Sequence, residues 1–211
     1  EESFEKTHPE IENAEEVKFN EDLMYKKALE NISMDGHFET IRAIEIAVAG
    51  KHNILATGAP GCGKTMAIQK FPAINPVLTL EEAQSVTRIW SLAGLIKPSQ
   101  PLIRIPPFRI PHQTASIEGI CGGGINCRPG EISLAHNGVL FLDELPEFQQ
   151  HTLETLRQPL EEKKIVISRA NATYTYPADF MLIAAANPCP CGYYPDRSRC
   201  NCSENDIKRY M

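Results

Sequence analysis

A glycine-rich segment in the first third of the chain carries residue types suited to holding phosphate. It has the sequence Gly-Ala-Pro-Gly-Cys-Gly-Lys-Thr over residues 58–65, which fits the pattern G-x-x-x-x-G-K-[ST]. Glycines allow such a loop to curl so that successive backbone N–H groups point at phosphate oxygens. Lys64 adds a positive charge for the β- and γ-phosphates, and the hydroxyl of Thr65 is a ligand for Mg²⁺. The segment therefore predicts a site for ATP and Mg²⁺.

The predicted nucleotide contacts form one continuous run of residues. They are Gly58, Ala59, Pro60, Gly61, Cys62, Gly63, Lys64, Thr65 and Met66. The apolar run 53–57 precedes them and predicts a buried strand, and a helix is expected to begin near Lys64. The positive N-terminus of that helix would then lie under the phosphates.

Acidic and amide side chains follow two further apolar runs, at the points where strands are expected to end. Asp143 and Glu144 come directly after residues 138–142, and Asn187 follows residues 180–186. In a parallel sheet the carboxyl ends of the strands meet at one edge. We therefore expect these three side chains to lie beside the glycine-rich loop.

These residue types can divide the chemistry of phosphoryl transfer among them. Thr65 and Asp143 are expected to hold Mg²⁺, and Glu144 to polarise the water that attacks the γ-phosphate. Asn187 can orient that water, or contact the γ-phosphate, without adding charge. Lys64, Glu144 and Asn187 are thus the predicted catalytic residues of an NTP hydrolase.

The cysteines form a second group of residues able to do chemistry. Four of the seven lie within 14 residues, with the spacing C-x-C-x8-C-x-C: Cys189, Cys191, Cys200 and Cys202. Four thiolates so close together can surround one tetrahedral Zn²⁺ ion, although structural zinc sites more often use C-x2-C pairs. Free thiols and disulfides are the alternatives, and disulfides fit poorly with a reducing cytosol.

Helices are indicated at three places along the chain. Apolar residues at helical spacing predict a helix over 37–49, with Gly50 placed to end it in the left-handed conformation. Residues 79–82 have the form of a capping box at the start of another helix. A third helix is expected over 150–158, where Pro159 limits its extension.

The strands indicate the fold class. Besides the three apolar runs that precede site residues, residues 164–169 and 172–176 are expected to form a hairpin around Ala170-Asn171. The proline-rich stretch 98–111 must be irregular or edge-like. Apolar strands that alternate with helices predict an α/β fold, with a parallel sheet covered by helices on both faces.

The composition fits a single globular domain with an extension. The 211 residues carry a formal net charge of −6, and 42% of them are hydrophobic. Residues 1–35 hold 11 acids and 4 bases, which leaves 16 acids and 17 bases for the rest. The acidity thus belongs to a segment typical of a solvated linker, and the neutral remainder does not exclude nucleic acid as a partner. No apolar run approaches the roughly 18 residues of a membrane span.

Several long segments together resemble one family, the magnesium chelatase-like AAA+ ATPases of the bacterial ComM/YifB type. The segments are Gly58–Thr65, Pro107–Ser116, Arg128–Gly138, Phe141–Phe148 and Asn187–Gly192. By this resemblance residues 58–65 are the Walker A loop, Asp143 and Glu144 the Walker B pair, and Asn187 sensor 1. The family usually has two adjacent histidines where this chain has His112-Gln113.

The resemblance also implies how the chain is organised. It implies an AAA+ P-loop NTPase core over residues 36–211, preceded by an acidic linker over 1–35. It further implies a helix-2 insert at roughly 100–130 and a pre-sensor-1 hairpin at roughly 163–178. The family's arginine finger, helical lid and N-terminal Lon-protease-like domain are not found in this chain, so we expect it to be part of a larger protein.

Family members are thought to form hexameric rings, and the ComM proteins resemble DNA translocases that promote branch migration. In such a ring the insert and the hairpin would face DNA in the pore. The candidate phosphate contacts are Lys163, Lys164 and Arg169 on the hairpin, and Arg104, Arg109 and Arg128 on the insert. A solvated basic edge is the simpler interpretation of the same residues.

Two other functions remain open from the sequence. The shared fold also permits the motor subunit of a magnesium chelatase, which drives metal into a porphyrin. A non-enzymatic alternative is an assembly switch that binds ATP and hydrolyses it poorly. A cytoplasmic protein without a membrane partner is expected in each case.

Overall fold

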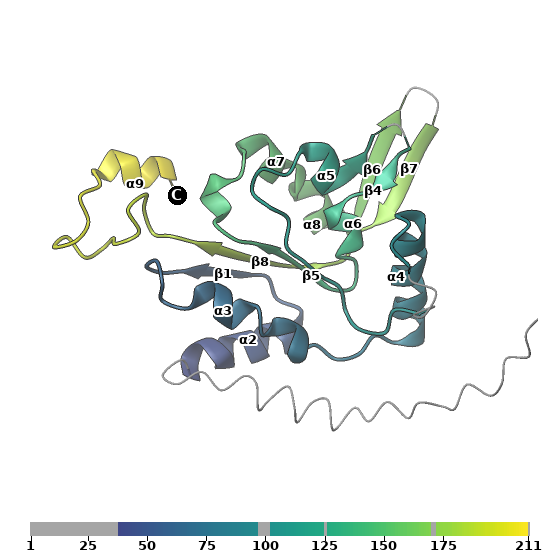
Figure 1. Ribbon diagram of the computed structural model, residues 1–211, viewed down its shortest axis with the longest axis horizontal. Coiled ribbons are helices and arrows are strands. Elements are labelled where there is room, and N and C mark those ends of the chain that lie inside the picture. The colour runs from purple at the N-terminus through teal and green to yellow at the C-terminus, as the bar shows by residue number, and fades with distance from the viewer. Residues whose placement is uncertain (1–37, 97–101, 125, 170–171, 211) are drawn as a thin grey trace, which may run out of the picture.

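The computed structural model describes residues 38–96, 102–124, 126–169 and 172–210 (Figure 1). The predicted linker over residues 1–35 and the hairpin tip at Ala170-Asn171 lie outside the described residues.

Four parallel strands form the central sheet. In the order of the sheet they are β1 (Ile54–Thr57), β8 (Met181–Ala186), β5 (Val139–Leu142) and β2 (Phe108–Arg109). The first three are the apolar runs identified in the sequence. The two residues of β2 form an edge strand within the proline-rich stretch, where an edge position tolerates the missing N–H donors.

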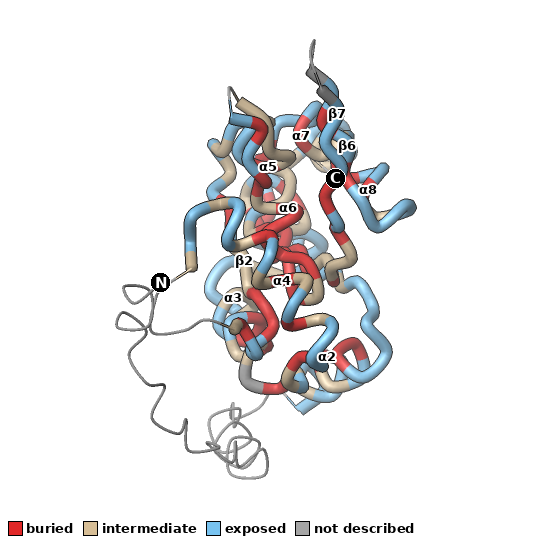
Figure 2. Tube along the Cα trace, turned by 90° about the vertical axis from the view of Figure 1, so that its right-hand side faces the viewer, coloured by how far each residue is buried: buried red, intermediate tan, exposed pale blue. Residues whose placement is uncertain are grey.

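Alternating residues of the strands supply two separate apolar faces. On β5, Val139 and Phe141 belong to one core cluster, and Leu140 and Leu142 to the other. All four residues of this strand are buried. The buried positions run through the middle of the molecule, as Figure 2 shows. The prediction of a parallel sheet covered on both faces is therefore confirmed.

One face is covered by α2 (Phe38–Gly50), α3 (Lys64–Ile68) and the 3₁₀ turn η1 (Phe71–Ala73). The helix predicted over 37–49 is thus present. The expectation that Gly50 ends it in the left-handed conformation is wrong, because Gly50 is the last helical residue and Lys51 has φ 52°.

Helix α4 (Leu80–Leu92) begins at the predicted capping box. The side chain of Thr79 accepts a hydrogen bond from the Glu82 N–H at 3.3 Å, and the Glu82 carboxylate accepts one from the Thr79 N–H at 3.0 Å. The helix contributes Ala83 and Val86 to a third apolar cluster, and Trp90 donates from its indole to the Leu134 carbonyl at 3.1 Å.

The insert and the residues directly after it contain short elements that the sequence pattern does not reveal. They are α5 (Ile117–Cys121), β3 (Gly122–Gly123), β4 (Arg128–Pro129) and α6 (Glu131–Leu134). Strands β3 and β4 pair antiparallel. Ile120 and Ile132 from the two helices are buried against the second face of the sheet.

The expected helix over 150–158 is two helices. After the turn η2 (Leu145–Glu147), the helices α7 (Gln150–Thr155) and α8 (Arg157–Glu162) are separated by Leu156. The expectation that Pro159 ends the helix is wrong. Pro159 is the third residue of α8, where the first turn has no intrahelical partner for an N–H, so its ring is accommodated.

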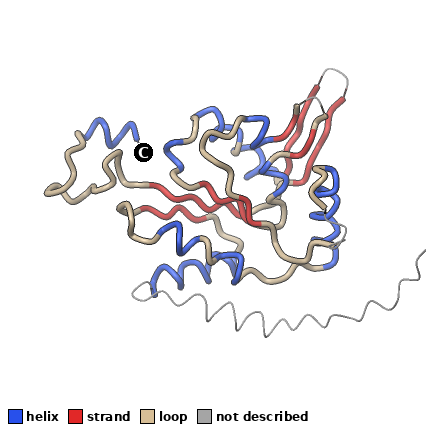
Figure 3. Tube along the Cα trace, viewed as in Figure 1, coloured by secondary structure: helices blue, strands red, loops and turns tan. Residues whose placement is uncertain are grey.

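The predicted hairpin is formed by β6 (Lys164–Arg169) and β7 (Ala172–Pro177). Ile165, Ile167 and Tyr176 attach one side of it to the second core cluster, and the Tyr176 hydroxyl donates to the Cys127 carbonyl at 2.7 Å. The hairpin and the insert therefore pack together. They lie at the opposite end of the molecule from α9 (Glu204–Tyr210), as Figure 3 shows.

His136 is a buried titratable group that holds three elements together. Its Nδ1 accepts from the Asp179 N–H at 3.1 Å, and its Nε2 lies 3.0 Å from the Ser85 hydroxyl of α4. Burial lowers the pKa of His136 below its ordinary value. As the pH falls, this histidine is therefore protonated earlier in the unfolded chain than in the folded chain. The stability of the folded chain is then lost below about pH 6.5.

We predict that the free energy of unfolding falls between about pH 7.5 and pH 5.5, and that His136→Gln flattens this dependence. Urea denaturation at the two pH values measures the effect. His151→Gln, which changes an exposed histidine, is the control. An equal pH dependence in the His136→Gln protein and the unmodified chain would contradict the assignment.

Candidate nucleotide-binding site

The predicted site residues from three strands lie at the carboxyl edge of the sheet. The glycine-rich loop at 58–65, hereafter the P-loop, follows β1, Asp143 and Glu144 follow β5, and Asn187 follows β8 (Figure 1). The Gly58 N–H donates to the Ala186 carbonyl at 3.3 Å, so the start of the loop is tied to the end of β8.

Lys64 is the centre of one group of contacts. Its Nζ donates to the carbonyl oxygens of Gly58 at 2.6 Å and Ala59 at 3.0 Å. It also donates to Oδ1 of Asn187 at 3.2 Å, although the two residues are 123 positions apart in sequence. The ammonium group therefore lies within the curl of the P-loop and links it to the end of β8.

Thr65 and Asp143 form a second group. The Thr65 hydroxyl donates to Oδ2 of Asp143 at 3.0 Å, and Oδ1 of Asp143 accepts from the Glu144 N–H at 3.0 Å. A hydroxyl and a carboxylate that converge in this way match the hard oxygen ligands that Mg²⁺ prefers. Glu144 itself is exposed beside them, with a left-handed backbone at φ 52°.

Two glycines give the P-loop its shape. Gly61 has φ 75°, and Gly63, which precedes α3, has φ 87°, a conformation that residues with a Cβ seldom adopt. The side chains of Cys62 and Met66 are exposed at the loop and at the first turn of α3. All nine residues of the predicted nucleotide run thus lie on one continuous turn from β1 into α3.

Tyr210 of α9 is a neighbour of the site that the sequence pattern missed. Burial and the negative charge of Glu147 raise the pKa of the Tyr210 phenol, while a hydrogen bond with Asn187 acts in the opposite direction. The last described helix therefore returns to the edge of the sheet where Asn187 lies. No periodic signal in the seven residues of α9 indicated this return.

The four clustered cysteines come directly after Asn187 and form one group of free thiols. Their sulfur atoms all lie within 4.8 Å of one another. Hydrogen bonding from the Tyr193 N–H lowers the pKa of Cys191 to about 6. Gly192, which lies between the two pairs of cysteines, is next to Pro60, so the cluster lies at the same edge of the molecule as the P-loop.

Arg109 has a structural partner that its place in the insert did not suggest. Its Nε and Nη2 donate to the two carboxylate oxygens of Glu131 at 2.6 and 2.7 Å, and its guanidinium lies 5.6 Å from the centre of the Trp90 ring. We therefore assign Arg109 a role in packing the insert against α4, and its contact with DNA stays a prediction.

The other candidate cations are differently placed. Lys163 pairs with Asp179 at 3.1 Å and Lys164 with Glu162 at 3.7 Å, yet the two lysine side chains are 65% and 50% exposed. Exposed pairs of this kind are weak, so both lysines can exchange partners. Arg104 and Arg128 are exposed, and the side chain of Arg169 lies outside the described residues.

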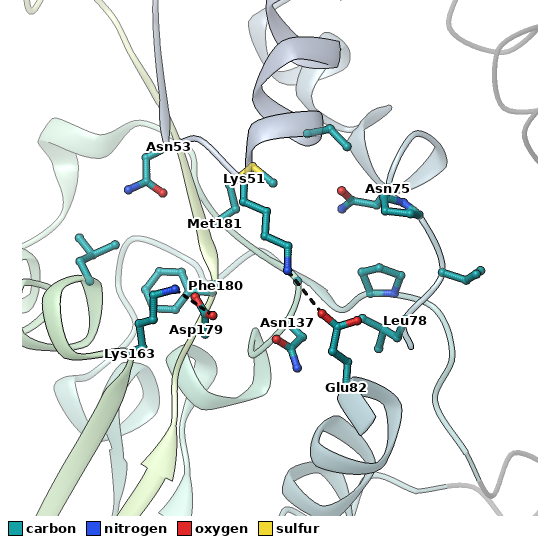
Figure 4. A pocket seen from close by; sticks show the side chains of 16 residues that line it. Lys51, Asn53, Asn75, Leu78, Glu82, Asn137, Lys163, Asp179, Phe180 and Met181 are labelled. Atoms are coloured by element: carbon teal, nitrogen blue, oxygen red, sulfur yellow. Dashed lines mark hydrogen bonds and ion pairs between the residues drawn. The ribbon is translucent and has the colours of Figure 1, made fainter. Parts of the chain in front are cut away.

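A pocket lies at the opposite edge of the sheet, where β5 and β8 begin (Figure 4). Two ion pairs line it, Lys51 with Glu82 at 3.4 Å and Lys163 with Asp179 at 3.1 Å. Of the residues predicted to bind nucleotide, none lines this pocket. We therefore place the candidate nucleotide site at the carboxyl edge.

Residues 30–211 match the protein-family model for the magnesium chelatase subunit ChlI. The chain belongs to this family. It is 48% identical over 170 residues to the uncharacterized protein YifB of Escherichia coli, and this match covers 81% of this chain and 33% of YifB. It is 45% identical over 186 residues to the competence protein ComM of Haemophilus influenzae, and this match covers 88% of this chain and 36% of ComM. The chain is thus a ChlI-family protein of the ComM/YifB type.

A solved structure supports the fold. The complex between subunits BchI and BchD of magnesium chelatase matches with a TM-score of 0.56 and 22% identity, over 71% of this chain and 51% of that chain. The predicted α/β fold of AAA+ P-loop NTPases is thereby confirmed. The ChlI-family chain spans about a third of the length of YifB and ComM. Within the described ranges, no helix is long and apolar enough to cross a bilayer.

We predict that Thr65→Ala removes most of the Mg²⁺-dependent gain in nucleotide affinity, whereas Thr65→Ser retains it, because serine keeps the hydroxyl that faces Asp143. A hydrogen bond to a charged group contributes about 1.5–3 kcal/mol, so the expected loss is about tenfold to hundredfold. Titration with a fluorescent ADP analogue, with and without Mg²⁺, measures it. Equal behaviour of the two variants would contradict a role for the hydroxyl.

Proposed function

We propose that the chain is the ATP-binding and ATP-hydrolysing core of a ring-forming AAA+ motor that acts on DNA. The observation that carries the proposal is the pair of long-range contacts at the sheet edge, Lys64 with Asn187 and Thr65 with Asp143. They support the proposal because they bring a cation, a hydroxyl, a carboxylate and an amide, the groups that NTP hydrolysis requires, together from three strands. The proposed motor would reside in the cytoplasm.

Each side chain has a distinct role in the proposed hydrolysis of ATP. The P-loop N–H groups and Lys64 would bind the phosphates, and Thr65 and Asp143 would hold Mg²⁺. Bound Mg²⁺ would neutralise charge on the phosphate oxygens. Glu144 would take the proton of the attacking water, and Asn187 would orient that water without adding charge. An arginine from a neighbouring subunit would stabilise the transition state, which is why a ring is proposed.

The hairpin supplies the proposed DNA contacts. One side of it is buried on the core through Ile165 and Ile167, so the residues between and beside them face outward. Lys164, Ser168 and Thr175 are exposed among these. Lysine and hydroxyl side chains contact phosphate oxygens without reading sequence, as translocation along any DNA requires.

The magnesium chelatase motor is the second candidate, because the matching family model is named for its ChlI subunit. The identity of 45–48% to ComM and YifB, against 22% to the BchI and BchD complex, favours the first proposal. An assembly switch with little turnover would share the nucleotide site, so turnover itself distinguishes the motor from the switch.

We predict that the full-length protein hydrolyses ATP, that DNA stimulates it, and that Glu144→Gln lowers kcat by about a hundredfold or more while nucleotide binding persists. Phosphate release is measured with single-stranded, duplex and branched DNA. Glu154→Gln, the same change on an exposed part of α7, is the matched control. An unaltered kcat in Glu144→Gln would contradict the assigned base, and absent DNA binding at low salt with ATP would contradict the motor.

We predict that Lys164→Glu weakens DNA binding and reduces the salt dependence of the binding constant by about 0.9 for each phosphate that the protein no longer neutralises. Fluorescence anisotropy of labelled DNA over a series of salt concentrations measures both quantities. Arg42→Glu reverses a charge on α2, which covers the other face of the sheet, and serves as the control. Equal effects of the two substitutions would show a general charge effect and contradict the proposed role of the hairpin.

A further inference from the structure

The segment that joins β8 to α9, residues 188–203, is folded around sulfur atoms and not around apolar side chains. The structure describes all of these residues, and the buried ones are Cys189, Gly192 and Cys200. None of the segment contributes to the three apolar clusters of the described chain. Short segments without a core of their own are commonly held by a metal ion or disulfides, and these cysteines are free.

The sulfur atoms have the spacing of a metal site. The Cys189 sulfur lies 3.4 Å from that of Cys191 and 3.8 Å from that of Cys200, and the latter two are 3.6 Å apart. The Cys202 sulfur lies within 4.8 Å of all three. Ligands at about 2.3 Å from a tetrahedral Zn²⁺ ion are about 3.8 Å from one another.

We propose that these four residues form a structural site for one Zn²⁺ ion: Cys189, Cys191, Cys200 and Cys202. Four protein thiolates complete a tetrahedron and leave no position for water or substrate, which distinguishes a structural zinc site from a catalytic one. Binding releases the thiol protons, and the free energy of binding is added to the stability of the segment.

The polypeptide between the two cysteine pairs is already arranged to close the site. Oδ1 of Asp196 accepts from the N–H and the hydroxyl of Ser198 at 3.0 and 2.6 Å, and the Asp196 carbonyl accepts from the Cys200 N–H at 2.8 Å. The guanidinium of Arg199 lies 4.0 Å from the centre of the Tyr193 ring. These contacts form a turn that returns the second pair of cysteines to the first.

Neighbouring groups also suit the negative charge of a zinc–tetrathiolate centre. The Tyr194 N–H donates to the Cys189 sulfur at 3.4 Å, and Nη1 of Arg197 donates to the Cys202 carbonyl at 2.9 Å. Donors and cations around the ligands commonly orient and stabilise a metal centre. The segment thus has ligands, a closed turn and a favourable electrostatic environment.

The zinc site would also hold the proposed nucleotide site in place. Gly192, with φ 83°, lies so close to the P-loop that an added Cβ would overlap with Cδ of Pro60. Asn187 is two residues before the first ligand, and α9, which ends at Tyr210, begins two residues after the last ligand. The ion would therefore fix the chain on both sides of the contact with the P-loop.

Metal analysis of the full-length protein, purified without chelators, tests the proposal. We expect about one equivalent of zinc that depends on these cysteines, measured by elemental analysis. The double substitution of Cys189→Ser and Cys200→Ser should remove it, whereas Cys121→Ser, which changes a partly buried cysteine outside the cluster, should retain it. Absence of zinc, or iron in its place, would overturn the proposal.

A second measurement uses the unmodified protein, so its result does not depend on whether a variant folds. A mercurial reagent added to the unmodified protein should release zinc in proportion to the thiols that react, as followed with a chromogenic chelator. Substitution with Co²⁺ should give the near-ultraviolet absorption of cobalt–thiolate bonds. Release of zinc without reaction of thiols, or absence of that absorption, would overturn ligation by cysteine.

The effect on nucleotide rests on the proposed nucleotide site, whereas the metal content does not. Lys64→Ala should lose nucleotide affinity and keep zinc. Gly192→Ala should weaken nucleotide binding, because its methyl group would displace Pro60. If Gly192→Ala bound nucleotide normally, the coupling of the two sites would be overturned while the zinc site itself would stand on the elemental analysis.

Discussion

The pairing of β8 between β1 and β5 is the constraint on which the rest of the structure depends. Because the three strands run parallel, the residues that follow them meet at one edge, although they are up to about 130 positions apart in the chain. Ile54 pairs with Ile183, and Leu142 with Ala184, which places Asn187 beside the P-loop. A slip of β8 by one residue would move its end by about 3.3 Å and turn its buried side chains to the opposite faces. The burial of both faces therefore also fixes the site.

One face of the central sheet is covered by the hairpin and the insert, which are the elements proposed to contact DNA. Leu140 and Leu142 of β5 pack in the cluster that contains Ile165 and Ile167 of the hairpin and Ile120 of the insert. The same strand ends at Asp143 and Glu144. The proposed catalytic carboxylates and the proposed DNA contacts are thus joined by one packed layer. Spatial continuity alone does not couple them, because coupling requires that the layer have two alternative arrangements.

The sequence predicted those parts of the structure whose signals are local. The P-loop pattern, the three apolar strands, the capping box at Thr79 and the hairpin are each determined by a few neighbouring residues, and the structure contains them all. The return of Tyr210 to Asn187 and the pairing of Arg109 with Glu131 are tertiary contacts without a periodic pattern. The break at Leu156 was missed because a proline in the first turn of α8 resembles one that ends the helix before it. The left-handed residue at Lys51 shows that the end of a helix is uncertain by one position even where a glycine is present.

Lys64 shows how these contacts limit one another. An ammonium group has three N–H donors, and Nζ already has three oxygen acceptors, on Gly58, Ala59 and Asn187. Phosphate oxygens that reach this group must therefore displace at least one of them. The two carbonyls belong to the P-loop itself, whereas the amide of Asn187 is held by β8 on one side and by the cysteine segment on the other. Release of Asn187 from Lys64 would free its amide for water or a γ-phosphate, so the arrival of the nucleotide would itself prepare the residue proposed to orient the attacking water.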